Sequence, residues 1–158
     1  MNKIITVLVD NESWILPYAE LLVEELNKLN IIASLCRHQD DIKQGDMCFF
    51  LGCVKLVTTK NLAKNNYNLV IHESDLPSGK GFAPMSWQIL AGENTVTVSL
   101  IEATENIDSG DIWLQESIEL NGTELHDEWR ASQGRCSVEL AKKFVVNQTT
   151  LVPKKKEG

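Results

Sequence analysis

Continuous apolar runs recur along the chain, and each has the length of a strand. The first, KIITVLVD at residues 3–10, is rich in β-branched side chains and lacks polar alternation, which is typical of a strand buried on both faces of a parallel sheet. The remaining predicted strands are residues 31–36, 47–52, 67–72, 95–103 and 111–120. The last two alternate apolar and polar residues, which indicates strands with two unlike faces.

Between these strands, apolar residues recur at helical spacing. One stripe predicts an amphipathic helix through Ile15, Tyr18, Ala19, Leu22, Leu26 and Leu29. Residues 56–66 favour helix more weakly, and residues 83–92 are predicted as a short helix that Gly92 ends. Residues 124–145 are predicted to close the chain as a helix. No linker composition precedes this last segment, so we expect it to pack on the sheet.

The alternation of strands and helices predicts an α/β fold with a mostly parallel sheet flanked by helices. In such sheets, ligands bind in the crevice outside the carboxyl ends of the parallel strands. A chain of 158 residues suits a single domain, which we expect to span residues 1–150. Residues 151–158 contain the only basic run and are expected to form a solvated C-terminal tail.

Charge and hydropathy exclude several classes of function. The net charge of −7 argues against a general affinity for nucleic acid, because phosphate binding relies on clustered Lys and Arg. No run approaches the ~18 apolar residues of a membrane span, and the N-terminus lacks the pattern of an export signal. We therefore expect a cytoplasmic protein with no membrane partner. Four cysteines without CxxC spacing predict reduced thiols and no metal site: Cys36, Cys48, Cys53 and Cys136.

A histidine at the end of a predicted strand is the first candidate for chemistry. His72 leads into SDLPSGKGFAP, where glycines let the backbone approach a ligand and prolines stiffen the loop. A lone histidine is nevertheless more often structural than catalytic. The second candidate is ENIDSGDIW at residues 105–113, although Asp, Ser and Gly also form ordinary turns. We expect His72 and Asp108 at one edge of the sheet, where a carboxylate fixes the imidazole tautomer and favours its charged form.

As a spaced pair, these two segments resemble the N10-formyltetrahydrofolate-dependent formyltransferases, which include methionyl-tRNA formyltransferase, glycinamide ribonucleotide formyltransferase and the sugar N-formyltransferases. The resemblance runs from about residue 68 to 115 and implies a Rossmann-like formyltransferase fold. The family's catalytic set is an Asn, a His two residues later and an Asp. His72 and Asp108 match the last two, whereas Val70 stands at the Asn position. Asn68 shares the strand face but lies ~6.6 Å from that position.

The resemblance also implies how these residues act. A substrate amine attacks the formyl carbon of N10-formyltetrahydrofolate, and hydrogen-bond donors stabilise the oxyanion that develops. A protonated His72 could supply such a donor, while Asp108 holds the imidazolium and helps to take the amine proton. In a family that grips the pterin ring largely through backbone groups, co-substrate binding is expected near Gly52 and Ile107.

The family's loop beside the reacting centre corresponds to GKGFAPMSW, residues 79–87. The resemblance therefore assigns Lys80 and Gly81 to co-substrate binding. Phe82 and Trp87 are large apolar residues of the same loop, and for both of them a place in the core competes with direct substrate contact.

Elimination among the members of the family shortens the list of candidate acceptor amines. The transfer RNA enzyme is disfavoured because it adds a C-terminal domain that helps to hold RNA and because this chain is acidic. The glycinamide ribonucleotide enzyme is disfavoured because residues 9–20, VDNESWILPYAE, lack a phosphate-cradling glycine. A small-molecule amine remains, and a nucleotide-linked amino sugar is the expected acceptor.

Three alternatives stay open at this point. His126 and Arg130 share a helix face and either contact a substrate phosphate or belong to a solvated surface. The chain is either an active formyltransferase or a catalytically weak or inactive domain that binds folate or a sugar nucleotide. A homodimer is compatible with both functions.

Overall fold

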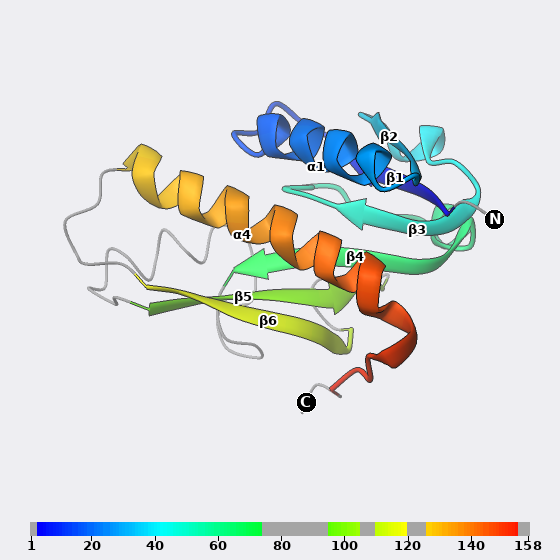
Figure 1. Cartoon of the computed structure of the whole chain (residues 1–158). Coiled ribbons are helices and arrows are strands. Elements are labelled where there is room, and N and C mark those ends of the chain that lie inside the picture. The colour runs from blue at the N-terminus through cyan, green and yellow to red at the C-terminus, as the bar shows by residue number, and fades with distance from the viewer. Residues whose placement is uncertain (1–2, 74–94, 105–109, 120–125, 155–158) are drawn as a thin grey trace.

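A computed structural model describes residues 3–73, 95–104, 110–119 and 126–154 of the chain (Figure 1). Its centre is a six-stranded sheet with the order β2-β1-β3-β4-β5-β6. The strands are β1 (Ile4–Leu8), β2 (Ile32–Cys36), β3 (Gly45–Phe50), β4 (Asn65–Glu73), β5 (Thr95–Glu102) and β6 (Ile112–Glu119). The described helices are α1 (Leu16–Lys28), α2 (Thr59–Leu62) and α4 (His126–Asn147), with short 3₁₀ turns η1 (Gln39–Asp41) and η2 (Gln148–Thr150).

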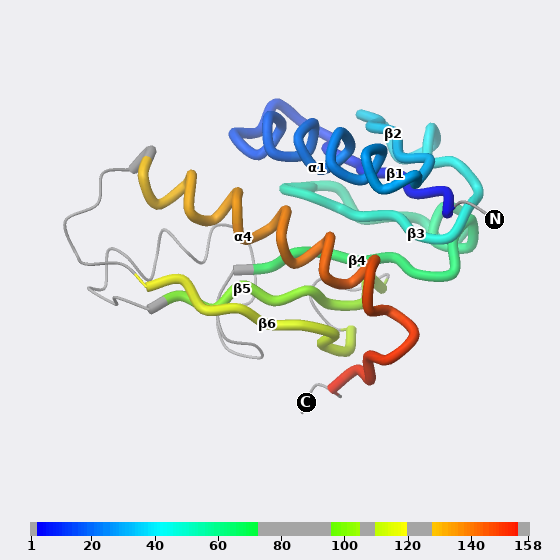
Figure 2. The backbone as a smooth tube through the Cα atoms, in the orientation of Figure 1, coloured from blue at the N-terminus to red at the C-terminus, as the bar shows by residue number. Residues whose placement is uncertain are grey.

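The first four strands are parallel, as the continuous apolar runs predict. β5 runs antiparallel to both of its neighbours, so β6 again points in the direction of β4. The path of the backbone in Figure 2 shows β4, β5 and β6 side by side at one end of the sheet. The predicted fold class, a mostly parallel α/β sheet flanked by helices, is confirmed.

α1 and α4 lie together on one face of the sheet (Figure 1). The core between them and the strands buries aliphatic and aromatic side chains, among them Ile5, Val7, Phe49, Leu69, Leu22, Leu26 and Phe144. Each fully buried side chain of this size stabilises the fold by about 1.5–3 kcal/mol. The last helix therefore packs on the sheet, as its lack of a linker predicts.

The opposite face of the sheet has a second, smaller core. Leu8, Cys48 and Phe50 are buried there against Ile42, with Val70 packed at the margin. Since β1 and β3 bury side chains on both faces, their sequences are apolar without alternation.

Several predicted elements end differently in the structure. Leu29 lies beyond the end of α1 and is 47% exposed, because Asn30 turns the chain with a positive φ of 61°. The helix predicted at residues 56–66 is only the single turn α2, and the one predicted at residues 83–92 lies outside the described residues. The first part of the expected tail is attached to the sheet, since the backbone of Lys154 exchanges two hydrogen bonds with Ile112.

Candidate active site

His72 lies one residue before the end of β4, at the carboxyl edge of the parallel strands. Its side chain is only 4% exposed and lies on the face opposite to α1 and α4, because the alternate residues Leu69 and Ile71 pack toward those helices. The predicted position at the end of a parallel strand is confirmed. A catalytic role for the imidazole stays a prediction.

A row of three polar side chains crosses the sheet at this point. His72 is the direct cross-strand partner of Ser99 on β5, and Ser99 is the partner of Gln115 on β6. Gln115 donates a hydrogen bond of 2.9 Å from Nε2 to the Ser99 hydroxyl, which is fully buried. Sequence reasoning missed Ser99 and Gln115. The sequence signal that could have indicated Ser99 is the alternation of TVTVSLIE, which places the hydroxyl side chains of this strand on a single face.

Val70 and Asn68 precede His72 on the same face of β4. Val70 is half-buried against the apolar pair Ile101 and Ile112. The amide of Asn68 donates to the Leu62 carbonyl at 2.8 Å and is therefore held away from His72. Four residues of strand separate Asn68 from His72, about 13 Å. Asn68 thus does not replace the missing Asn.

The strand ends that flank residues 105–109 lie close to the middle of β4. β5 ends at Glu102, which pairs with Leu69, and β6 begins at Ile112 beside Ile101. Both ends lie level with Leu69 and Val70 near the middle of β4, whereas His72 is close to its carboxyl end. The expected convergence of Asp108 with His72 at one edge of the sheet stays a prediction. Asp108 and Ile107 themselves lie outside the described residues, and so do Lys80 and Gly81.

Near the middle of β4, the Glu102 carboxylate accepts a hydrogen bond from the Asn68 backbone N–H at 3.0 Å. Burial raises the pKa of this carboxyl above its usual value, an effect that the hydrogen bond from Asn68 partly opposes. Glu102 therefore anchors the end of β5 to β4.

Gly52, a predicted co-substrate contact, begins the loop that leaves β3 at the carboxyl edge. Its φ of +60° is in the left-handed region, and an added Cβ would lie 2.9 Å from both Ile15 Cγ2 and Ser13 Oγ. The Gly52 carbonyl accepts a hydrogen bond from Asn11 Nδ2 at 2.8 Å. The backbone here is thus held in one conformation, while binding of a pterin by Gly52 stays a prediction.

Two polar side chains hold the rest of that loop. Asp10, at the end of β1, accepts backbone hydrogen bonds from Val54 and Lys55, each at 3.0 Å. Gln39 accepts from the Thr58 N–H at 3.0 Å and donates to the Leu56 carbonyl at 3.1 Å. At the place where phosphate-binding folds have glycine, this chain therefore has Asp10, whose carboxylate holds a neighbouring loop in position.

Arg130 lies between aromatic rings. Its guanidinium carbon is 4.7 Å from the centroid of the Trp14 ring and 5.1 Å from that of Trp129. Such cation–π contacts join the start of α4 to the segment before α1. Because α4 covers the face opposite to His72, this arrangement does not support the predicted phosphate contact, nor is Arg130 a simply solvated residue. The side chain of His126 lies outside the described residues.

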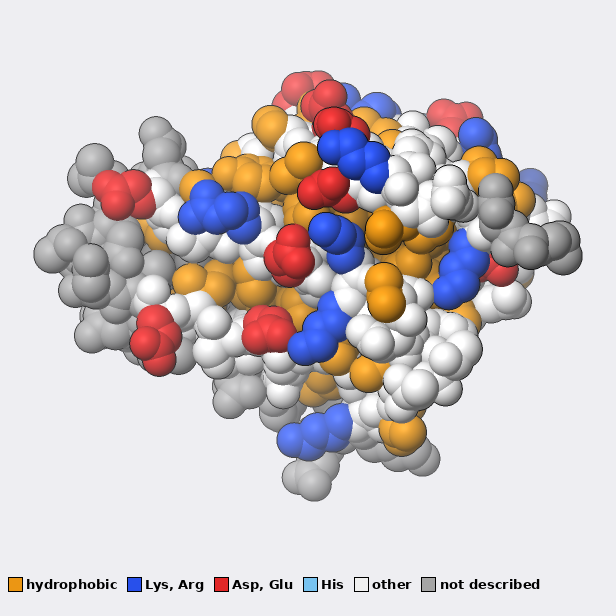
Figure 3. Space-filling view, in the orientation of Figure 1, with side chains coloured by type: hydrophobic (Ala, Val, Ile, Leu, Met, Phe, Trp, Pro, Cys, Tyr) orange, Lys and Arg blue, Asp and Glu red, His pale blue; other side chains and the backbone are white. Residues whose placement is uncertain are grey.

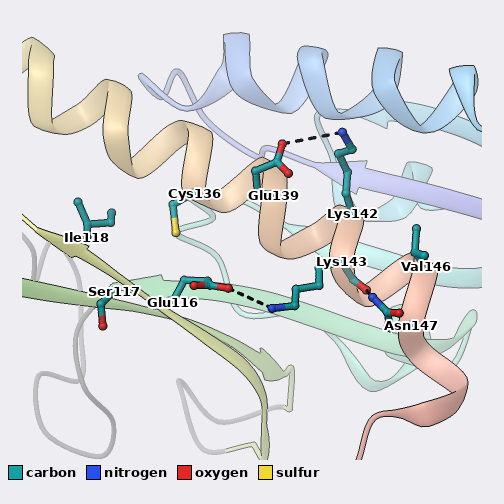
Figure 4. A pocket seen from close by; sticks show the side chains of 9 residues that line it. All are labelled: Glu116, Ser117, Ile118, Cys136, Glu139, Lys142, Lys143, Val146 and Asn147. Carbon is teal, nitrogen blue, oxygen red and sulfur yellow. Dashed lines mark hydrogen bonds and ion pairs between the residues drawn. The ribbon is translucent and has the colours of Figure 1, made fainter.

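A groove of about 600 Å³ runs between β6 and α4 (Figure 4). An ion pair of 3.2 Å between Lys143 and Glu116 crosses it, and burial raises the pKa of the Cys136 thiol on its wall to about 11. Glu116 and Ile118 pair with Val98 and Val96 on the α4 side of the sheet. The groove is therefore separate from the polar row at His72.

The thiols on the His72 side of the sheet are poorly suited to nucleophilic chemistry. Burial raises the pKa of Cys53 to about 12, and that of Cys48 is also raised well above its usual value. Among the described residues, no three His, Cys, Asp or Glu side chains gather where they could hold a metal ion. No described helix is both long and apolar enough to cross a membrane.

Comparison with known proteins identifies the family. The formyl transferase family model matches residues 28–133, and the chain belongs to this family. Methionyl-tRNA formyltransferase of Rickettsia bellii is 34% identical over 96 residues, which are 58% of this chain and 30% of that protein. The chain spans about a third of the length of the curated relatives it matches.

Two solved structures share the fold. Methionyl-tRNA formyltransferase from Clostridium thermocellum superposes with a TM-score of 0.75 at 23% identity, covering 100% of this chain and 70% of that one. WlaRD, a sugar 3N-formyltransferase solved in the presence of dTDP and 5-N-formyl-THF, gives a TM-score of 0.75 at 17% identity, covering 100% of this chain and 67% of that one. At these identities the likeness concerns the fold.

Proposed function

We propose that this chain transfers a formyl group from N10-formyltetrahydrofolate to the amine of a small molecule, with a nucleotide-linked amino sugar as the acceptor. The observation that carries the proposal is the position of His72 in a member of the formyl transferase family. Its imidazole is buried at the carboxyl edge of a parallel strand, beside a loop that Asp10 and Gln39 hold in place. In open α/β sheets this edge is where ligands bind.

The chemistry follows from that position. The acceptor amine attacks the formyl carbon, the carbonyl oxygen becomes an oxyanion, and tetrahydrofolate leaves as the carbon–nitrogen bond to N10 breaks. A ring N–H of His72 donates to the oxyanion. Asp108 takes the proton that the amine loses, directly or through water, and this proton passes on to N10 as the carbon–nitrogen bond breaks, so tetrahydrofolate leaves as a neutral amine. Gly52, Ile107, Lys80 and Gly81 contact the co-substrate, largely through their backbone groups.

Two features bear on the acceptor. The segment before α1 presents Asp10 and Glu12 where a phosphate-binding turn would present glycines, which argues against glycinamide ribonucleotide. Among relatives of the same fold, WlaRD is a sugar formyltransferase. Relatives that act on methionyl-tRNA belong to the same family, so the acceptor has to be decided by experiment.

A second candidate function is a folate-binding domain with little or no turnover. The packing of Val70 against Ile101 and Ile112 favours it, because an apolar side chain supplies no donor to an oxyanion. Loss of one such donor typically lowers the rate by about 10²–10³.

Turnover assays separate these functions. The protein is mixed with N10-formyltetrahydrofolate and either a nucleotide-linked 4-amino sugar or methionyl-tRNA, and release of tetrahydrofolate is followed by absorbance. We expect turnover with the amino sugar that falls by about 10²–10³ in His72→Ala. The matched control is His38→Ala, since His38 is exposed and its ring accepts a hydrogen bond within η1.

Each other outcome has a defined meaning. Turnover that survives in His72→Ala contradicts the assigned role of His72. Folate binding without turnover on any amine supports the second candidate, and turnover on methionyl-tRNA alone contradicts the amino-sugar acceptor.

A further inference from the structure

Arg37, the first residue after β2, turns its guanidinium toward the loop that joins β1 to α1. Its Nε donates to the Val9 carbonyl and a terminal nitrogen donates to the Asn11 carbonyl, both at 2.8 Å. Because the guanidinium is planar with its donors in a fixed fork, the two bonds hold both carbonyls in one arrangement. The Val9 N–H also donates to the Cys36 carbonyl at 3.1 Å, so the end of β1 is tied to the end of β2.

Asn11 connects this loop to the loop that follows β3. Its Nδ2 donates to the Gly52 carbonyl and to Asp10 Oδ1, each at 2.8 Å. The Asp10 carboxylate also accepts two backbone N–H groups of the second loop, each at 3.0 Å. Residues 52–55 are therefore held through Asn11 and Asp10, and the backbone of Asn11 is in turn held by Arg37.

An alternative role for Arg37 is to bind a substrate phosphate. Two of its nitrogens are directed at backbone carbonyls, and the terminal nitrogen that contacts the Asn11 carbonyl also lies 3.2 Å from Glu12 Oε1. A cation that already faces two carbonyl dipoles and a carboxylate offers little attraction to a further anion. The contacts therefore favour a role in holding the loops.

We propose that Arg37 and Asn11 are positioning residues for the co-substrate, because they hold Gly52 in the conformation that binds N10-formyltetrahydrofolate. The proposal rests on the function proposed above, in which Gly52 contacts the co-substrate through its backbone. A loop that is already ordered loses less conformational entropy on binding, so the affinity is higher. In this role neither residue contacts the reacting atoms, so its loss changes the affinity and not the chemical step.

Binding of 5-formyltetrahydrofolate, measured by calorimetry, tests the proposal without turnover. We expect Kd to rise about tenfold in Arg37→Ala and in Asn11→Ala, the effect of losing a hydrogen bond. Asn11→Asp should bind more weakly still, because its carboxylate would face Asp10 and the Gly52 carbonyl. The matched control is Glu12→Ala. Glu12 is 92% exposed, and its loss keeps both bonds from Arg37 to backbone carbonyls, so Kd should stay at the wild-type value.

Two further measurements separate positioning from a simple loss of stability. With an amine that supports turnover, KM for N10-formyltetrahydrofolate should rise in Arg37→Ala, while kcat at saturating co-substrate stays unchanged. In the wild type, the amides of Val54 and Lys55 should be protected from hydrogen exchange by Asp10, and Asn11→Ala should lower this protection. Wild-type amides that exchange at the unprotected rate would overturn the proposal, whether or not any variant folds.

The failure of this proposal is distinguishable from the failure of the proposed function. An unchanged Kd in both Arg37→Ala and Asn11→Ala would overturn it while leaving formyl transfer in place. A lower kcat with an unchanged KM would also contradict it, since the two residues would then act on the chemical step. If the wild type binds no folate, the co-substrate role falls together with the proposed function, and lost amide protection in Asn11→Ala then shows only that Asn11 holds the loop.

Discussion

Val70 stands where the formyltransferase resemblance expects an amide, and its surroundings explain why an apolar residue is kept there. Phe50 is its partner on β3, and Ile101 is its partner on β5. The side chain is half-buried in the apolar contacts that join these strands. A polar group at this position would lose contact with water without gaining an obvious partner.

This packing predicts the result of Val70→Asn. The free energy of unfolding should fall by about 1–3 kcal/mol, because a buried amide is left without hydrogen bonds. Urea unfolding measures the change, and Val70→Ala is the control that removes packing without adding an amide. Val70→Asn should be less stable than Val70→Ala. A variant that is as stable as Val70→Ala and also gains at least about tenfold in kcat would instead show that the amide reaches the oxyanion.

Among the elements, α1 and α4 contact each other, and Gly134 of α4 lies against Tyr18 of α1. A Cβ at this position would lie 2.6 Å from three ring atoms of Tyr18. Tyr18 has little freedom to move, because its ring packs edge-on against Trp14 with centroids 6.0 Å apart. Trp14 in turn contacts the Arg130 guanidinium. The absence of a side chain at residue 134 therefore permits this helix crossing.

Gly134→Ala should destabilise the protein even though alanine favours helix. Overpacking against Tyr18 costs about 1–3 kcal/mol, whereas alanine in place of glycine returns only about 0.5–1 kcal/mol. Urea unfolding of the variant is compared with the same change in a Tyr18→Ala background. In that background, we expect Gly134→Ala to be neutral or stabilising. Equal effects in both backgrounds would show that the contact with Tyr18 is not the cause.

The elements also show what a sequence can and cannot predict. All six strands can be predicted from local sequence patterns. A strand buried on one face alternates apolar and polar residues, whereas a strand buried on both faces is apolar throughout. The direction of β5 does not follow from its own residues, because TVTVSLIE would alternate in the same way in either direction. Because of that reversal, β5 ends and β6 begins beside Leu69 and Val70, near the middle of β4.

Within the candidate site the same distinction holds. His72 was found because it ends an apolar run, which is a local signal. Ser99 and Gln115 are brought to it only by strand pairing between distant segments. The segment of residues 9–20 shows in sequence only that it lacks glycine, yet in the structure the Asp10 carboxylate holds the backbone of Val54 and Lys55. Long-range pairing of this kind leaves no periodic trace in one sequence.

For the molecule as a whole, the distribution of charge bears on the acceptor. On the face that carries α1 and α4, acidic and basic side chains are interspersed (Figure 3). Lys142 lies 3.8 Å from both Glu25 and Glu139, and Lys143 lies 3.2 Å from Glu116. These lysines are therefore partly neutralised by neighbouring carboxylates, and the net charge of −7 adds a general repulsion of polyanions.

This charge distribution predicts weak binding of transfer RNA by the isolated chain. Because Lys142 and Lys143 are paired with carboxylates, few counterions are released from this face, so Kd at physiological salt should be no tighter than about 10⁻⁴ M. Fluorescence anisotropy of labelled methionyl-tRNA at several salt concentrations measures it. The double variant Glu25→Lys, Glu139→Lys removes both carboxylates beside Lys142 and adds two lysines, so it should bind tRNA more tightly, with an affinity that falls steeply as salt rises. Micromolar binding by the wild type with the same steep salt dependence would contradict the prediction, because it would require a basic surface that the paired lysines of α4 do not provide, and it would return transfer RNA to the list of acceptors.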